Sequence, residues 1–164
     1  MEKTEILLPE NLAEQGKSIC YAAAVMLVSE GGGYLLQQRD STPGIWYPDM
    51  LGFFGGGIDS HEDAETALRR ELMEELEFNP RKLTYFSFVC YDTARFGPGV
   101  GCRYIYESEV TKEDMAQMTQ HEGAGMKLLS PDDVLSREHP IAPVDLQMLY
   151  VHLMCRGLVP QPAE

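Results

Sequence analysis

The apolar positions of the chain fall into short runs separated by glycine, proline and polar residues. Residues 18–29 (SICYAAAVMLVS) form a nearly continuous apolar run, and YLLQQRD follows at residues 34–40 after the turn sequence EGGG. Runs of this length bounded by turn residues are typical of strands, so these two segments are expected to pair as a hairpin. Residues 1–17 show no comparable pattern and are expected to form an N-terminal arm.

Further along the chain, strand and helix patterns follow one another. Residues 41–50 hold two prolines, a glycine and the only tryptophan, which predicts a loop, and LGFFGGGIDS then predicts a short strand entering a glycine-rich turn. A helix is predicted for residues 60–78, where Ser60 and Asp63 have the spacing of a capping box. The other predictions are strands at 83–94, 99–110 and 126–130 and helices at 111–118, 131–138 and 143–157. The mixture predicts an α/β or α+β layered fold.

Length and composition indicate one domain. A chain of 164 residues, 44% of them hydrophobic, is long enough to bury a substantial core. We expect the domain to span residues 18–157, with 158–164 as a C-terminal tail. No apolar run approaches the roughly 20 residues of a transmembrane helix, and the acidic N-terminus lacks the apolar segment of a secretory signal. A cytoplasmic location is therefore expected.

Charge and cysteine spacing narrow the function further. A net charge of -13 argues against nucleic acid or an anionic membrane as a partner. The cysteines form no C-x-x-C pair and are expected to be ordinary thiols rather than disulfides or zinc ligands; they are Cys20, Cys90, Cys102 and Cys155. Between residues 56 and 78, eight acids face only two arginines. Such a local excess is best matched by a small divalent cation.

Three of these acids share one face of the predicted helix. With Glu71 as the origin, Glu74 lies at about -60° and Glu75 at about +40° around the helix axis. The leucines at positions 68, 72 and 76 form an adjacent apolar stripe, so the glutamates border the buried face. Clustered carboxylates beside an apolar wall favour protonation unless a cation compensates, and Mg²⁺ prefers such oxygen ligands. The glycines at 55–57 leave room for a ligand to approach the backbone.

The segment GGIDSHEDAETALRRELMEELEF resembles the Nudix box, G-x5-E-x7-R-E-U-x-E-E-x-G-U, where U is a bulky aliphatic residue. The matching residues are Gly56, Glu62, Arg70, Glu71, Leu72, Glu74 and Glu75. The resemblance implies a Nudix-type α/β/α sandwich with a central mixed β-sheet. One departure is Glu77, which stands where the box has its second glycine. Without that glycine, the helix is expected to run slightly further and to stop at Asn79-Pro80.

The resemblance also implies roles for individual residues. The metal, Mg²⁺ or Mn²⁺, would be bound by Glu71, Glu74 and Glu75, with the backbone of Gly55 or Gly56 contributing. Arg70 would orient Glu71, and Glu62 would support the loop and the arginine. One of the glutamates, or a glutamate from a distant loop, would act as general base, and Glu122 in QHEGAGM is our choice for that residue. The catalytic set is therefore Arg70, Glu71, Glu74 and Glu122.

Residues outside the box are expected to choose the substrate. Before the box, the aromatic and basic candidates are Arg39, Trp46, Tyr47 and Phe53; after it, they are Tyr91, Arg95, Arg103 and Tyr104. Aromatic rings stack on nucleobases, and arginines pair with phosphate. Trp46 is the foremost candidate because it lies in a proline-bounded loop shortly before the glycine turn.

The implied activity is metal-dependent hydrolysis of the diphosphate linkage in a nucleoside diphosphate derivative. A nucleotide sugar, a nucleoside triphosphate and another dinucleotide-type diphosphate all remain open. The segment RDSTPGIWYPDMLGFFGGGID resembles bacterial Nudix proteins, and this resemblance favours nucleotide sugars. The alternative is a non-catalytic Nudix-fold domain that senses a nucleotide, but the box retains every acid of its R-E-U-x-E-E core. Relatives in this family also make a homodimer possible.

Overall fold

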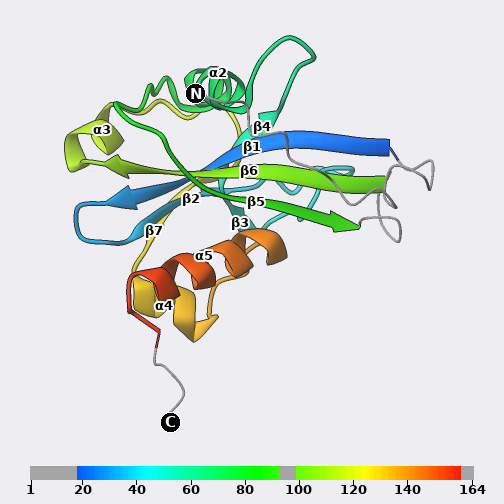
Figure 1. The fold of residues 1–164 in the computed structure, drawn as a ribbon. Helices are drawn as coiled ribbons and strands as arrows, with labels where there is room; N and C mark the ends of the chain where they lie inside the picture. The colour runs from blue at the N-terminus through cyan, green and yellow to red at the C-terminus, as the bar shows by residue number, and fades with distance from the viewer. Residues whose placement is uncertain (1–17, 93–98, 160–164) are drawn as a thin grey trace.

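The computed structural model describes residues 18–92 and 99–159. Within these ranges a central mixed sheet separates two helical layers (Figure 1). The predicted arm at 1–17, residues 93–98 with the candidate Arg95, and the last five residues lie outside the described residues. The strands are β1 (Ser18–Ser29), β2 (Tyr34–Gln38), β3 (Leu51–Gly52), β4 (Phe54–Gly57), β5 (Thr84–Asp92), β6 (Gly99–Val110) and β7 (Gly125–Leu129). The helices are α2 (Ala64–Leu76), α3 (Lys112–Gln117), α4 (Pro131–Ser136) and α5 (Pro143–Cys155).

The strand β1 organises the sheet. The sheet order is β3-β2-β1-β6-β5, with β4 paired to β1 and β7 paired to β2. The β1 and β6 strands run parallel over their full length, from Ser18 opposite Gly99 to Ser29 opposite Val110. The β2 and β4 strands both pair with β1 in the antiparallel sense, at its later and earlier residues respectively. This mixed sheet between helices confirms the predicted α/β/α sandwich.

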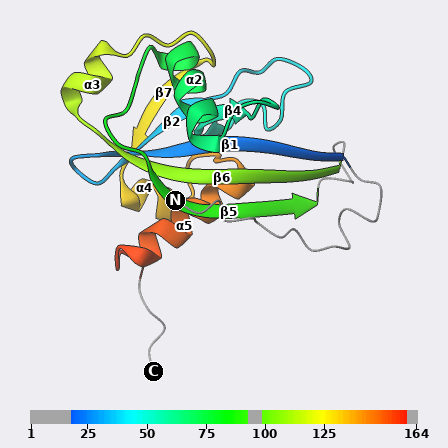
Figure 2. The same cartoon turned by 45° about the horizontal axis from the view of Figure 1, so that its top comes forward.

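Both faces of β1 are buried, which explains its unbroken apolar sequence. Ala23, Val25 and Leu27 pack with the leucines of α2 on one face. Ala24 and Met26 pack with residues of α5, including Leu149 and Leu153, on the other. Figure 2 shows the same arrangement, with α2 on one side of the sheet and α4 and α5 on the opposite side. None of the helices in the described ranges is long and apolar enough to cross a membrane.

The boundaries of α2 differ from the prediction at both ends. Asp63, not Ser60, is the N-cap, because its Oδ1 accepts a hydrogen bond of 2.8 Å from the Thr66 backbone N–H. At the other end, the helix stops at Leu76 instead of continuing to Asn79. Glu77 takes the left-handed conformation, with φ 53° and ψ 31°, that the box normally assigns to glycine. The turn geometry is therefore retained even though the glycine is absent.

The prediction that all four cysteines are thiols is also wrong. Cys90 on β5 lies directly opposite Cys102 on β6, and the two are joined by a disulfide. Cys20 and Cys155 are free and exposed. The sheet register brings the bonded pair together across 12 positions of sequence, and no spacing motif marks it.

Candidate active site

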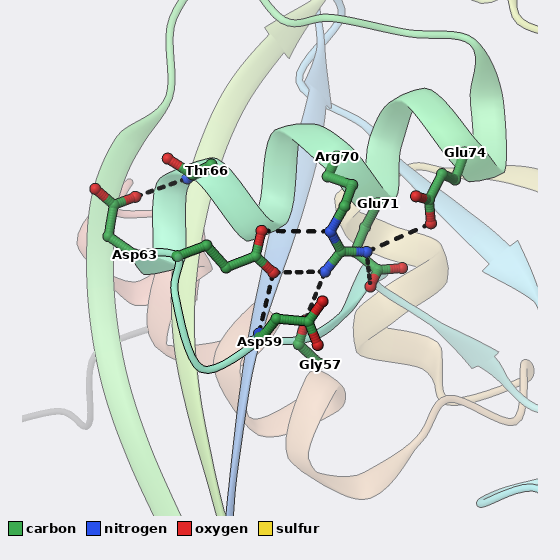
Figure 3. Close-up of polar contacts among 8 residues, drawn as sticks. Gly57, Asp59, Asp63, Thr66, Arg70, Glu71 and Glu74 are labelled. Atoms are coloured by element: carbon green, nitrogen blue, oxygen red, sulfur yellow. Dashed lines mark hydrogen bonds and ion pairs between the residues drawn. The ribbon is translucent and has the colours of Figure 1, made fainter.

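Arg70 connects the acidic residues of α2 with the loop that precedes it. Its guanidinium donates to both Glu62 carboxylate oxygens, at 2.7 and 3.3 Å, and to the Gly57 carbonyl at 3.1 Å. It also donates to Glu71 Oε1 at 2.8 Å and to Glu74 Oε2 at 3.4 Å, as Figure 3 shows. Hydrogen bonds to Glu62 and Glu71 raise the pKa of Arg70, and the same contact lowers the pKa of Glu62. The arginine therefore stays charged and holds three carboxylates in place.

Glu75 has a different environment, although it lies on the same helix. Its residue surface is only 5% exposed. The Gly55 backbone N–H donates to Oε2 at 3.1 Å, and Gln37 Nε2 lies 3.5 Å from Oε1. Desolvation is the main reason that the pKa of Glu75 rises to about 8, and the charges of Glu122 and Glu71 add to it. Both of these hydrogen-bond donors are neutral, so the environment disfavours the carboxylate unless a cation joins it.

The glycine-rich strand β4 packs against the acidic face of α2. Gly55 has φ +125°, and a side chain there would collide with the backbone of β1. A Cβ at Gly56 would overlap the Glu71 carboxylate, with both of its oxygens 2.6 Å away. Glycine at 55 therefore lets β4 pair closely with β1, and glycine at 56 leaves room for the Glu71 carboxylate against the strand.

A cleft of about 280 Å³ opens beside this contact. Its lining includes Gln37, Arg39, Gly55, Glu71, Glu75 and Glu122. The prediction had placed Glu122 near the box glutamates on resemblance alone, and the structure brings it to the same cleft. Arg39 contributes a basic side chain to the lining of this otherwise acidic cleft.

The donors at this cleft fit a hard divalent cation, because they are carboxylates next to accessible backbone. In the conformation of the structure, no group of three or more histidine, cysteine or acidic side chains within 18–92 and 99–159 is arranged to hold a metal ion. Glu71 and Glu74 turn towards Arg70, while Glu75 turns towards Gly55 and Gln37. A ligand set of all three would require these carboxylates to exchange part of their present contacts.

Comparison with a protein-family model decides the classification. The model of the NUDIX domain matches residues 20–150. The chain belongs to the Nudix family. Pyrophosphohydrolysis is the activity general to this family, so the protein is a Nudix pyrophosphohydrolase, and Nudix hydrolases generally use divalent metals.

Solved structures of other Nudix proteins share the fold. The Escherichia coli ORF135 protein has 20% identity and a TM-score of 0.68, over 92% of this chain and 98% of that one. The MutT protein of Methanosarcina mazei Go1 has 15% identity and a TM-score of 0.70, over 86% and 96%. The NUDIX domain of Shewanella oneidensis NrtR, crystallised with ADP ribose, has 20% identity and a TM-score of 0.63, over 97% and 100%. No curated protein matches the sequence.

The loop of residues 41–50, which precedes the box, carries two of the predicted substrate residues. Trp46 and Tyr47 are half-buried and meet edge to face, with ring centroids 6.2 Å apart. The Trp46 carbonyl accepts a hydrogen bond of 2.7 Å from Arg39 Nε, which ties the loop to the cleft-lining arginine. Tyr47 and Asp49 both have positive φ, an uncommon conformation that is concentrated at functional sites.

Phe53 is placed differently from the prediction. It is 2% exposed and belongs to the core cluster on the α5 face of the sheet. A ring buried among core side chains does not stack on a nucleobase, so the predicted substrate contact of Phe53 is wrong in this structure. Its alternative role is to anchor the strand that leads into Gly55.

The structure also shows two buried polar residues that sequence reasoning missed, one at the Nudix site and one on the α5 side of the sheet. Gln37 is 5% exposed and contacts both Glu75 and the backbone carbonyl of Glu122. The sequence feature that could have indicated Gln37 is an amide side chain near the end of an apolar strand. Asp145, 3% exposed in the first turn of α5, accepts from the Phe53 backbone N–H and from Arg103 at 2.6 Å. An acid in a first helical turn is ordinary, so nothing in the sequence marked it.

Proposed function

We propose that the protein hydrolyses the diphosphate linkage of a nucleoside diphosphate derivative, in a reaction that depends on Mg²⁺ or Mn²⁺. The observation that carries the proposal is Glu75, a buried acid whose hydrogen-bond donors among residues 18–92 and 99–159 are the neutral Gly55 amide and Gln37 side chain, and which shares one cleft with Glu71 and Glu122. A charge in such a place is costly unless a cation compensates it.

We assign the metal-binding role to Glu71, Glu74 and Glu75, with the backbone at Gly55 beside them. A bound divalent cation supplies charge neutralisation at the diphosphate and lowers the pKa of water. Arg70 orients Glu71 and Glu74 through its hydrogen bonds, and it is itself held by Glu62. Its proposed role is positioning within the catalytic set, because its contacts are all to protein carboxylates and a backbone carbonyl.

The proposed general base is Glu122. Glu122 lines the cleft from the loop before β7, so it comes from a different segment than the helix carboxylates. As a water oxygen forms its bond to phosphorus, the proton of that water passes to the Glu122 carboxylate. The bridging P–O bond breaks, and the chain releases two phosphorylated products.

A nucleotide sugar is the substrate class that we favour. ADP ribose, the ligand of the Shewanella oneidensis NrtR domain, joins a nucleoside diphosphate to a sugar. Arg39 at the cleft is suited to a phosphate, and the neighbouring Trp46 and Tyr47 offer aromatic surface to a base or sugar. We propose that the protein hydrolyses its substrate in the cytoplasm, through a domain of residues 18–157, and that it acts either as a monomer or as a homodimer.

A substrate panel tests the function. The protein is incubated with ADP ribose, UDP-glucose, dGTP and a dinucleoside diphosphate, with Mg²⁺, Mn²⁺ or EDTA, and phosphate is measured after phosphatase treatment. We expect metal-dependent product from at least one sugar derivative, with loss of activity in Glu75→Gln and full activity in Glu65→Gln, an exposed acid on the same helix. Binding of a nucleotide without turnover across the panel would overturn hydrolysis in favour of the sensor.

A further inference from the structure

The loop that carries Glu122 lies directly against the C-terminal end of α2. The Thr119 backbone N–H donates to the Leu76 carbonyl at 3.0 Å, and the His121 backbone N–H donates to the Glu75 carbonyl at 2.8 Å. Carbonyls in the last turn of a helix have no partner within the helix, so these two bonds complete the helix end. Because one of them is made by the residue next to Glu122, the position of Glu122 is tied to Glu75.

The same loop is fastened on its other side to β2. The Ala124 backbone N–H donates to the Gln38 carbonyl at 2.8 Å, and the Gln37 side chain donates to the Glu122 carbonyl at 3.3 Å. Gln120 Nε2 donates to the same carbonyl at 2.7 Å. The backbone of Glu122 is therefore held between the acidic helix and the sheet.

Glu77, the departure from the Nudix box, adds a side-chain contact to this junction. Its Oε1 lies 2.7 Å from His121 Nε2. Its backbone makes the tight turn of a glycine: the Glu77 N–H bonds to the Met73 carbonyl, and the Phe78 N–H bonds to the Leu72 carbonyl. A left-handed conformation is unfavourable for a residue with a side chain. Glycine at this position would remove the strain, but it has no atom that reaches His121.

We propose that Glu77 is a positioning residue, which holds the loop of residues 119–124 on α2 through His121 and so places Glu122 beside Glu75. The inference rests on the proposed function, in which Glu122 takes the proton from water. Glu77 itself lies outside the cleft lining and acts through its neighbour. The residue that breaks the family pattern is thereby part of the catalytic geometry.

The expected effect is moderate, because both partners are about half exposed, at 49% for the His121 side chain and 55% for that of Glu77. Exposed pairs contribute little, so we expect Glu77→Ala to lower kcat about two- to fivefold with KM unchanged. Glu65→Ala is the matched control, since it removes an exposed partner of Arg69 at 2.9 Å on the same helix, away from the loop.

Glu77→Gly separates positioning from a purely structural role. It restores the glycine of the box and relieves the turn, so its melting temperature should equal or exceed that of Glu77→Ala. If Glu77 positions Glu122, kcat of the glycine variant still falls about two- to fivefold. If Glu77 only completes the helix end, the glycine variant keeps the parental kcat, and the proposal is overturned.

The route through His121 and Glu122 is tested with double mutants. His121→Ala should lower kcat as much as Glu77→Ala, and the pair together no further. In a Glu122→Gln background, Glu77→Ala should leave the residual kcat unchanged. Additive effects in either combination would contradict the proposal.

A measurement without substrate distinguishes failure of this inference from failure of the proposed function. Hydrogen exchange of the Thr119 and His121 amides is followed by NMR in the parent, Glu77→Ala and Glu65→Ala proteins. We expect exchange about two- to fivefold faster in Glu77→Ala alone. Unchanged exchange overturns the role of Glu77 even if the enzyme is active. Faster exchange in a protein that hydrolyses no substrate would refute the hydrolase, but it would still show that Glu77 holds the loop of residues 119–124 on α2.

Discussion

Two buried acids, one on each side of the sheet, differ in the groups that balance their negative charge. Asp145 on α5 pairs with Arg103 at 2.6 Å and accepts the Phe53 backbone N–H at 3.0 Å. Glu75 on α2 is similarly buried, at 5% against 3% exposure, but its hydrogen-bond donors are the Gly55 amide and the Gln37 side chain. The charge of Asp145 is compensated by the protein itself. Glu75 is compensated only partly, and this is the property expected of a cation ligand.

The first way to test the comparison is to remove Asp145. Asp145→Ala should reduce the free energy of unfolding by about 3–5 kcal/mol, because it leaves the Arg103 guanidinium buried without the carboxylate that balances its charge. Urea denaturation measures the loss. Asp132→Ala, an exposed acid in the first turn of α4, is the control and should change stability by less than about 0.5 kcal/mol. A loss below about 1 kcal/mol in Asp145→Ala would show that the pair is not a structural anchor.

The corresponding change on the other side should spare the fold and damage the activity. Glu75→Gln should lower kcat about 100-fold, near 2.7 kcal/mol, as for loss of one preorganised electrostatic group. Without metal at pH 7 the variant should be at least as stable as the parent, because folding of the parent requires Glu75 to take up a proton at that pH and the neutral amide does not. Steady-state kinetics and urea denaturation are compared. A variant that unfolds as readily as Asp145→Ala would mean that the two acids are alike.

The pH dependence of stability provides the third test. The pKa of Glu75 is raised from an ordinary 4.5 to about 8, so the folded protein retains a proton that the unfolded chain releases. Stability then decreases as pH rises between these values. Without metal, we expect a loss of about 2 kcal/mol between pH 6 and 8 from this group. Denaturation curves at pH 6 and pH 8 should show this loss of stability in the parent but not in Glu75→Gln. An equal dependence of stability on pH in the two proteins would refute the assignment to Glu75.

The two acids also differ in how well the sequence predicted their environments. The apolar run of β1, the glycines of β4 and the box spacing predicted the layered fold and brought Glu71 and Glu75 to one face, since these signals are local and periodic. The resemblance added Glu122, which the cleft contains.

What could not be predicted depends on contacts between distant segments. The Asp145–Arg103 pair, the Cys90–Cys102 disulfide and the Gln37 contacts all depend on strand register and helix docking. Burial of Phe53 likewise depends on how the segment between β3 and β4 packs against the α5 side of the sheet. Glu77 was misread because its side chain was expected to avoid a left-handed turn, whereas the surrounding backbone bonds impose that turn.

The smallest expected effect concerns metal affinity. A carboxylate must lose its proton to bind a cation, so Mg²⁺ affinity in the parent should rise about tenfold per pH unit below pH 8, which is near 1.4 kcal/mol per unit. At pH 7, binding should release close to one proton. Calorimetric titrations in two buffers with different ionisation enthalpies measure the protons released at each pH.

The control for this titration is Glu75→Gln, whose amide has no proton to exchange. Any remaining Mg²⁺ binding in that variant should be weaker and nearly independent of pH between 6 and 8, because the group that releases the proton in the parent has been removed. Asp145→Asn should retain the parental proton release, since its carboxylate lies on the opposite face of the sheet. Release of a proton from the Glu75→Gln protein would assign the titrating group elsewhere, and it would remove the physical distinction between the two buried acids.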